Sequence, residues 1–194
     1  LTVLMLMQLT TPCFAILSGD TGEEVPGQGM VVFDENGFLI NSYVDMGEGW
    51  VAALERAESG KQTRIKLLSD WTPNTEDGFY YKDDDDDEYG TNNGCLYLED
   101  EDVDIAIDLN GHSIDRKLTS ATDDGHVFWV YGSTLTIYDS SEAQTGKITG
   151  AYSDEEGGAF YIHDEDSKVY IKGGTICGNK AEKGGAFFVY NGSL

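Results

Sequence analysis

Acidic side chains are the most numerous groups in this chain that could do chemistry. The 194 residues include 36 Asp and Glu against 12 Lys and Arg, a formal net charge of −24. Such a surface repels nucleic acid and anionic lipid, and it suits divalent cations or cationic partners. A run of consecutive carboxylates supplies hard oxygen ligands for calcium, although it lacks the glycine and the spacing of an EF-hand. The sequence therefore predicts either weak calcium binding or a solvated acidic loop at Asp83, Asp84, Asp85, Asp86, Asp87 and Glu88.

A second set of polar residues resembles parts of the catalytic pattern of pectin-cleaving enzymes. Asp123-Asp124-Gly125-His126 is similar to one polygalacturonase motif, and Arg64-Ile65-Lys66 is similar to another. In those enzymes the basic tripeptide follows the acidic motif, whereas here it precedes it. A lyase needs an arginine near several calcium-binding aspartates, but Arg116 has only Asp115 within five residues. We therefore assign no catalytic residue in this chain.

Three aromatic residues occupy equivalent positions in successive repeats described below, namely Trp129, Tyr161 and Phe188. Each lies between two apolar residues of a short alternating run, so its side chain points away from the buried face. Exposed aromatic rings could bind glycans or proteins. Alternatively, they stack on one another as an exposed ladder and bind nothing.

Cysteine and histidine give no sign of a metal site. The chain has three cysteines, without a CxxC motif or a Cys/His cluster, so a zinc site is not indicated. Cys95 and Cys177 either pair with each other or remain as two buried thiols.

The first fifteen residues predict export. Leu1 to Ala15 combine a short apolar run with a small-residue end, which is typical of a signal peptide. The run is too short to span a bilayer, and a buried first strand or helix is the alternative interpretation. We predict a signal peptide over residues 1–15 and a linker or small hairpin over 16–47. The predicted localisation is secreted or cell-surface, with no membrane-spanning segment apart from the signal peptide.

Regular structure is predicted from residue 48 onward. Apolar residues from Trp50 to Ala57 follow helical spacing, and Gly60 is a plausible end. A strand is expected at Arg64–Leu68. The dense like charges between Asp70 and Asp104 predict a solvated loop.

Internal repetition is the strongest signal. Gly146-Lys-Ile-Thr-Gly recurs as Gly174-Thr-Ile-Cys-Gly, 28 residues later, and Gly157-Gly-Ala-Phe recurs as Gly184-Gly-Ala-Phe, 27 residues later. Each repeat holds three short apolar strands separated by turn residues, without a helical pattern between them. The repeats predict that Ile114, Ile148 and Ile176 stack inside the fold, and likewise Phe128, Phe160 and Phe187.

Three strands per repeat predict an all-β fold, a right-handed parallel β-helix, which is a three-sided solenoid. The short helix near Trp50 is placed to cap its N-terminal end, because an open solenoid end exposes apolar side chains. Tyr190-Asn-Gly-Ser-Leu194 parallels Tyr131-Gly-Ser-Thr-Leu135. We therefore expect a β-helix over residues 48–194 that is cut off in mid-repeat.

The runs at 65–71, 107–116 and 135–150, with the Gly-Gly repeats, resemble large surface proteins of gut-type Gram-positive bacteria. Similar repeats occur in chlamydial polymorphic outer-membrane proteins. The resemblance, over about residues 48–194, implies an exported, adhesin-like β-helix of the pectate-lyase-like superfamily. From the residues themselves we predict a non-catalytic extracellular scaffold or adhesin-like module that binds a glycan or a surface protein, without a cofactor apart from weak calcium. The alternative is a polysaccharide lyase or glycoside hydrolase whose site lies partly outside this chain.

Overall fold

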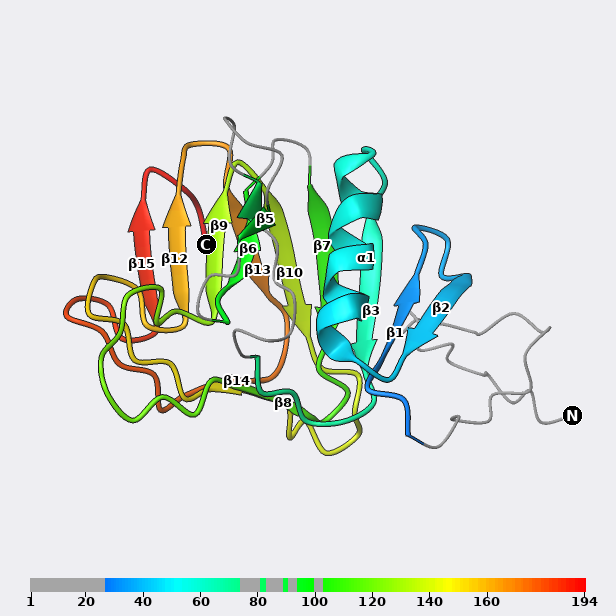
Figure 1. The fold of residues 1–194 in the computed structure, drawn as a ribbon, viewed down its shortest axis with the longest axis horizontal. Coiled ribbons are helices and arrows are strands. Elements are labelled where there is room, and N and C mark those ends of the chain that lie inside the picture. Colours follow the sequence, from blue (N-terminus) through cyan, green and yellow to red (C-terminus); the bar gives the residue numbers. More distant parts are fainter. Residues whose placement is uncertain (1–26, 74–80, 83–88, 91–93, 100–102) are drawn as a thin grey trace, which may run out of the picture.

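The fold is mostly β-sheet with a single α-helix among the residues described (Figure 1). The computed structural model describes residues 27–73, 81–82, 89–90, 94–99 and 103–194. The predicted signal peptide, the first part of the predicted linker and the calcium candidates Asp83–Glu88 lie outside the described residues.

The elements are short and follow one another closely along the chain. They are β1 (Met30–Phe33), β2 (Leu39–Tyr43), α1 (Met46–Glu58), β3 (Thr63–Leu67), β4 (Tyr81–Lys82), β5 (Tyr89–Gly90), β6 (Leu96–Leu98), β7 (Asp104–Asp108), β8 (Ser113–Asp115), β9 (Phe128–Tyr131), β10 (Thr134–Tyr138), β11 (Lys147–Thr149), β12 (Phe160–His163), β13 (Lys168–Ile171), β14 (Thr175–Ile176) and β15 (Phe187–Tyr190).

Successive repeats contribute one strand each to three sheets. The sheet orders are β13-β10-β7-β3-β1-β2, β14-β11-β8 and β15-β12-β9-β6, and β4 pairs with β5 separately. Within the repeats all pairing is parallel and in register, so equivalent residues lie beside one another. The predicted alignments of Ile114 with Ile148 and Ile176, and of Phe128 with Phe160 and Phe187, are confirmed.

One further layer precedes the three repeats. β3 pairs with β7, Trp71 forms a parallel bridge to Ile114, and β6 pairs with β9. The prediction of a solvated loop is therefore wrong for β6, whose Leu96 and Leu98 are fully buried. The acidic residues around this strand obscured a short apolar alternation, Leu-Tyr-Leu, that is itself a strand signal.

Helix α1 covers the apolar interior at the β3 end of the sheets. Asp45 caps it by accepting hydrogen bonds from the backbone N–H groups of Gly47 and Glu48. The ring of the fully buried Trp50 lies 6.3 Å from that of Trp71 and 6.5 Å from that of Phe128. The helix spans Met46–Glu58, so it begins earlier than the sequence predicted.

A close backbone approach brings the helix onto the first strand. A Cβ atom on Gly49 would lie 2.5 Å from the Met30 sulfur, so only glycine fits there without a shift. β1 pairs antiparallel with both β2 and β3, which places a hairpin inside the segment predicted as a linker or small hairpin. This hairpin extends the largest sheet beyond the helix (Figure 1).

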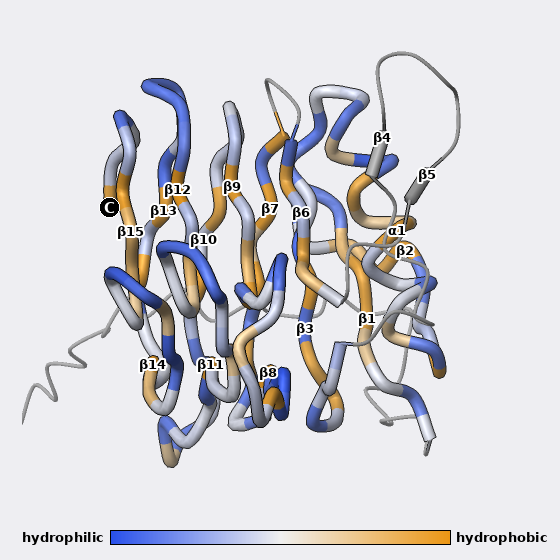
Figure 2. Tube along the Cα trace, turned by 60° about the vertical axis from the view of Figure 1, so that its left-hand side comes forward, coloured by the Kyte–Doolittle hydropathy of each residue, from blue (hydrophilic) through white to orange (hydrophobic). Residues whose placement is uncertain are grey.

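The apolar side chains face the space that the three sheets enclose. Figure 2 shows hydrophobic residues along the strands and hydrophilic residues in the connecting turns. At the other end of the sheets from α1, an apolar groove of about 460 Å³ lies beside β13, lined by residues that include Ile171, Ile176, Phe187 and Leu194. Ser193 forms a parallel bridge with Lys168.

Candidate functional site

The outer face of the sheet β15-β12-β9-β6 carries two columns of aromatic rings. In the first column, Tyr97 stacks on Trp129 at 5.5 Å between centroids, Trp129 on Tyr161 at 4.4 Å, and Tyr161 on Phe188 at 5.6 Å. In the second column, His163 lies between Tyr131 at 5.5 Å and Tyr190 at 5.0 Å. We call these seven residues the aromatic face.

Strand geometry explains why these rings face outward. Side chains alternate along a β-strand, so Phe128 and Val130 point into the core while Trp129 and Tyr131 point away from it. The parallel register then places the outward residues of each repeat directly on those of the next. The three predicted ligand residues, Trp129, Tyr161 and Phe188, are therefore brought together.

The stacking decides which part of each ring is accessible. The rings of the first column are inclined to one another by only 16 to 23°, so neighbouring rings cover each other's faces. The side chains of this column remain half-buried. This arrangement offers an amphipathic strip rather than separate free ring faces.

A buried polar cluster lies behind one end of this face. Arg116 donates hydrogen bonds to the backbone oxygens of Asp124 and His126, and Nδ1 of His126 donates to the Gly157 oxygen at 2.5 Å. The Tyr97 hydroxyl donates to the Asp124 carboxylate. The His126 ring lies 5.8 Å from Trp129, so the cluster supports the aromatic face from behind.

Burial sets the protonation of this cluster. It raises the pKa of the Tyr97 hydroxyl above its usual range, and the neighbouring Cys95 and Asp124 raise it further. Burial also lowers the pKa of His126, which outweighs the stabilising bond to Gly157. His126 is therefore neutral near pH 7, with its proton on Nδ1.

The motif similar to that of pectin-cleaving enzymes is used for structure. His126 is fully buried and Arg116 nearly so, and both donate to main-chain oxygens. Arg64 and Lys66 lie on β3, in a different sheet from β9. The His126 ring is fully buried and lies 5.5 Å from the Tyr161 ring of the first aromatic column.

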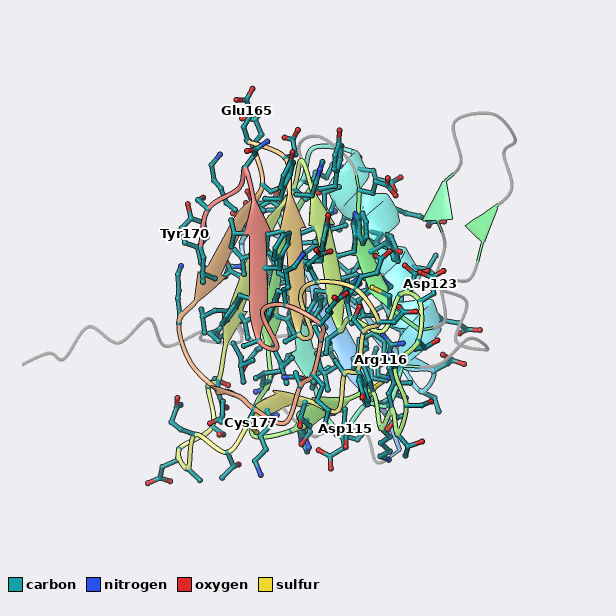
Figure 3. The ribbon with its side chains drawn as sticks, turned by 90° about the vertical axis from the view of Figure 1, so that its left-hand side faces the viewer. Asp115, Arg116, Asp123, Glu165, Tyr170 and Cys177 are labelled. Atoms are coloured by element: carbon teal, nitrogen blue, oxygen red, sulfur yellow. The ribbon has the colours of Figure 1, made fainter. Side chains whose placement is uncertain are left out.

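Asp123 lies on the same side of the molecule as Arg116 (Figure 3). Burial raises the pKa of Glu155, as do the nearby charges of Asp123 and Asp154. Glu156 forms an ion pair with Lys183 at 2.7 Å. Within the part of the chain that the structure describes, no three His, Cys, Asp or Glu side chains converge as a metal site.

Sequence reasoning missed four members of the aromatic face, Tyr97, Tyr131, His163 and Tyr190. Three of them stand two positions after the predicted residues, so the same alternation that identified Trp129 could have found them. Tyr97 was hidden in the acidic segment. Cys95 and Cys177 do not pair with each other, and the alternative of two buried thiols is correct for Cys95 but wrong for Cys177, which is exposed.

Comparison with known proteins identifies no family for this chain. Among the described residues, no helix is long and apolar enough to cross a membrane. A scan against protein-family models, a search of curated proteins and a search of solved structures each returned no match.

Proposed function

We propose that the three parallel sheets are the sides of a right-handed parallel β-helix. In support, each repeat contributes one strand to each of the three sheets. In every sheet, the strands of successive repeats lie side by side in sequence order. A solenoid of this kind is held together by contacts between neighbouring repeats only.

Removing one whole repeat tests this proposal. Deletion of residues 135–168 joins Thr134 to Val169 and places β13, β14 and β15 on β7, β8 and β9 with matched side chains. We expect a folded protein of lower stability, because one layer of a solenoid is dispensable. Deletion of residues 135–151 breaks the register and should leave the far-ultraviolet circular dichroism of an unfolded chain. Unfolding of both proteins would contradict the proposal.

The function that the geometry supports best is that of a non-catalytic extracellular scaffold, an adhesin-like surface module. The single observation that carries it is the aromatic face, a rigid strip of seven rings on one outer sheet. The resemblance to exported surface proteins of gut-type Gram-positive bacteria agrees with this role. Secretion and surface location belong to the same proposal.

The geometry favours a protein over a glycan as the partner of the aromatic face. A sugar ring stacks on a free aromatic face, and the middle rings have neither face free. Ring edges, tyrosine hydroxyls and a flat outline are typical of protein interfaces, where tyrosine and tryptophan are enriched. A glycan is the second candidate.

The alternative of a polysaccharide lyase or hydrolase has weaker support. Arg116 and His126, the groups that such an enzyme would turn toward substrate, are buried and donate to backbone oxygens. Their positions agree better with support of the aromatic face.

Retention on immobilised gastric mucin tests the binding proposal. We expect the full chain to bind, and the Trp129→Ala variant to bind about tenfold more weakly, because hot-spot aromatic residues contribute that much or more. Tyr170→Ala is the matched control, since Tyr170 is an exposed ring on β13, in a different sheet. Periodate treatment of the mucin should leave binding intact and protease treatment should abolish it. Equal binding by Trp129→Ala would overturn the role of the aromatic face.

A further inference from the structure

Among the residues that the structure describes, the outermost strand of the largest sheet has no partner strand on its outer side. β2 ends the sheet order, and Figure 1 shows it on the far side of β1 from β3. The Tyr43 carbonyl oxygen accepts a hydrogen bond from the Gly29 N–H on the β1 side. Backbone groups of successive strand residues point to opposite sides, so the Ser42 N–H points away from β1. That N–H is bonded only locally, to the side-chain oxygen of Asn41 at 2.9 Å.

The same strand exposes apolar side chains that a partner could cover. The exposed fractions are 54% for Phe38, 44% for Leu39, 46% for Ile40 and 71% for Val44. Soluble proteins usually protect an edge strand with lysine, proline or a cover, and Leu39–Tyr43 contains neither residue. An apolar, unguarded edge is the geometry that accepts an added strand.

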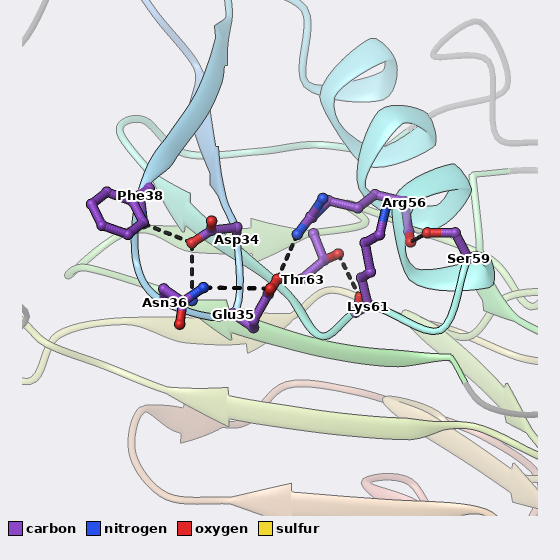
Figure 4. Close-up of polar contacts among 8 residues, drawn as sticks. All are labelled: Asp34, Glu35, Asn36, Phe38, Arg56, Ser59, Lys61 and Thr63. Carbon is purple, nitrogen blue, oxygen red and sulfur yellow. Dashed lines mark hydrogen bonds and ion pairs between the residues drawn. The ribbon is translucent and has the colours of Figure 1, made fainter.

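The hairpin is held rigidly against the helix, which keeps this edge in place. Figure 4 shows Asp34 accepting the N–H groups of Asn36 and Phe38 at the tip of the hairpin. The Arg56 guanidinium at the end of α1 forms an ion pair with Glu35 at 2.6 Å. The edge is therefore preorganised, which lowers the entropic cost of binding.

The charges around β2 indicate which kind of segment this edge would attract. Asp34 and Glu35 precede the strand, Asp45 and Glu48 follow it, and the first basic residue of the chain is Arg56. A second copy of the chain would bring another −24 charges, which Coulomb repulsion disfavours, whereas a basic segment is attracted.

We propose that the free edge of β2 binds an extended segment of another protein chain, in which apolar residues alternate with lysine or arginine. The segment pairs with the outward backbone groups at Ser42 and covers Ile40 and Val44. This site is separate from the aromatic face, so it stands independently of the function proposed for that face.

A labelled synthetic peptide of about eight residues, alternating valine and lysine, tests the proposal by fluorescence anisotropy with the full chain. We expect saturable binding that weakens about tenfold when glutamate replaces lysine, or when every peptide nitrogen is methylated. Ser42→Pro removes the outward donor and should weaken binding similarly, while the matched control Ser42→Ala should bind as the parent does. Ile40→Thr is a second variant that keeps strand propensity and should also weaken binding.

Three outcomes would overturn the proposal. The first is an absence of peptide binding, or binding that neither Ser42→Pro nor Ile40→Thr weakens. The second is a dimer of the free chain, by light scattering, that Ser42→Pro abolishes, because the occupant would then be a second copy. The third is slow hydrogen exchange of the Ser42 N–H in the free monomer that persists when Asn41→Ala removes its local acceptor, because the chain's own residues would then cover the edge.

Discussion

Replacing Trp50 with alanine should lower the free energy of unfolding by about 4 kcal/mol, as removal of a fully buried tryptophan does in other cores. Trp50 is completely buried between α1 and the interior of the sheets, where it meets Trp71 and Phe128. The cavity would lie where the helix contacts the sheets, so the helix would lose its main anchor. Urea denaturation followed by circular dichroism measures the loss.

Two variants distinguish the loss of Trp50 packing from a general effect of changing a residue in α1. Trp50→Phe keeps most of the buried volume and should cost clearly less than the alanine variant. Glu55→Ala changes an exposed residue of the same helix and should shift stability by less than about 0.5 kcal/mol. If Trp50→Ala cost no more than Glu55→Ala, the helix would not be an energetically important cap.

Replacing Asp139 with alanine should cost about 3 kcal/mol near neutral pH, because backbone donors would lose a charged acceptor. Its Oδ1 accepts from the N–H groups of Gly111 and Ser141, and its Oδ2 accepts from Gly146 at 2.7 Å. One carboxylate thus holds turns from two repeats together. Asp115→Ala, which removes an acceptor of the single Lys117 N–H, is the matched control and should cost much less.

The stabilisation that Asp139 contributes should be lost at low pH. Burial alone would raise the pKa of this carboxyl, but hydrogen bonds from Ser141, Gly146 and Gly111 outweigh it and lower the pKa below its usual value. The stabilisation is therefore complete above the unfolded value, about 3.9 for aspartate, and is lost as pH falls through the lower folded value. The stability difference between parent and variant should be flat from pH 5 to 7 and narrow below about pH 4. A difference that stays constant down to pH 2 would contradict this assignment.

Much of the strand arrangement could be predicted because the repeats are nearly identical. The Gly-Gly pairs marked the turns correctly: Gly157 and Gly184 have φ of 77° and 65°, which favours glycine over other residues. The alternation around Phe160 and Phe187 then fixed which side chains face inward. The strand β3 was predicted, but its layer with Trp71 and β6 was not, because that layer does not share the sequence of the repeats and is interrupted by the acidic segment.

The site was harder to predict than the fold. Position in the repeat identified Trp129, Tyr161 and Phe188, but sequence alone could not decide whether stacked rings leave their faces free. The roles of Arg116 and His126 depended on the direction of their hydrogen bonds, which bring a buried side chain onto distant main-chain oxygens. No spacing rule encodes such contacts: Arg116 reaches the oxygens of Asp124 and His126 within its own repeat, and His126 reaches the Gly157 oxygen of the next repeat.

Helix α1 precedes the stacked strands in the sequence, so it is synthesised before the repeats that stack beyond it. A chain synthesised from its N-terminus presents α1 and β3 before the repeats, and each later repeat finds a completed parallel template to join. At 5–20 residues per second, a repeat of roughly 30 residues emerges every few seconds, far slower than a strand can pair. Growth of the fold can therefore keep pace with synthesis, with one apolar layer exposed at any moment, always at the growing end.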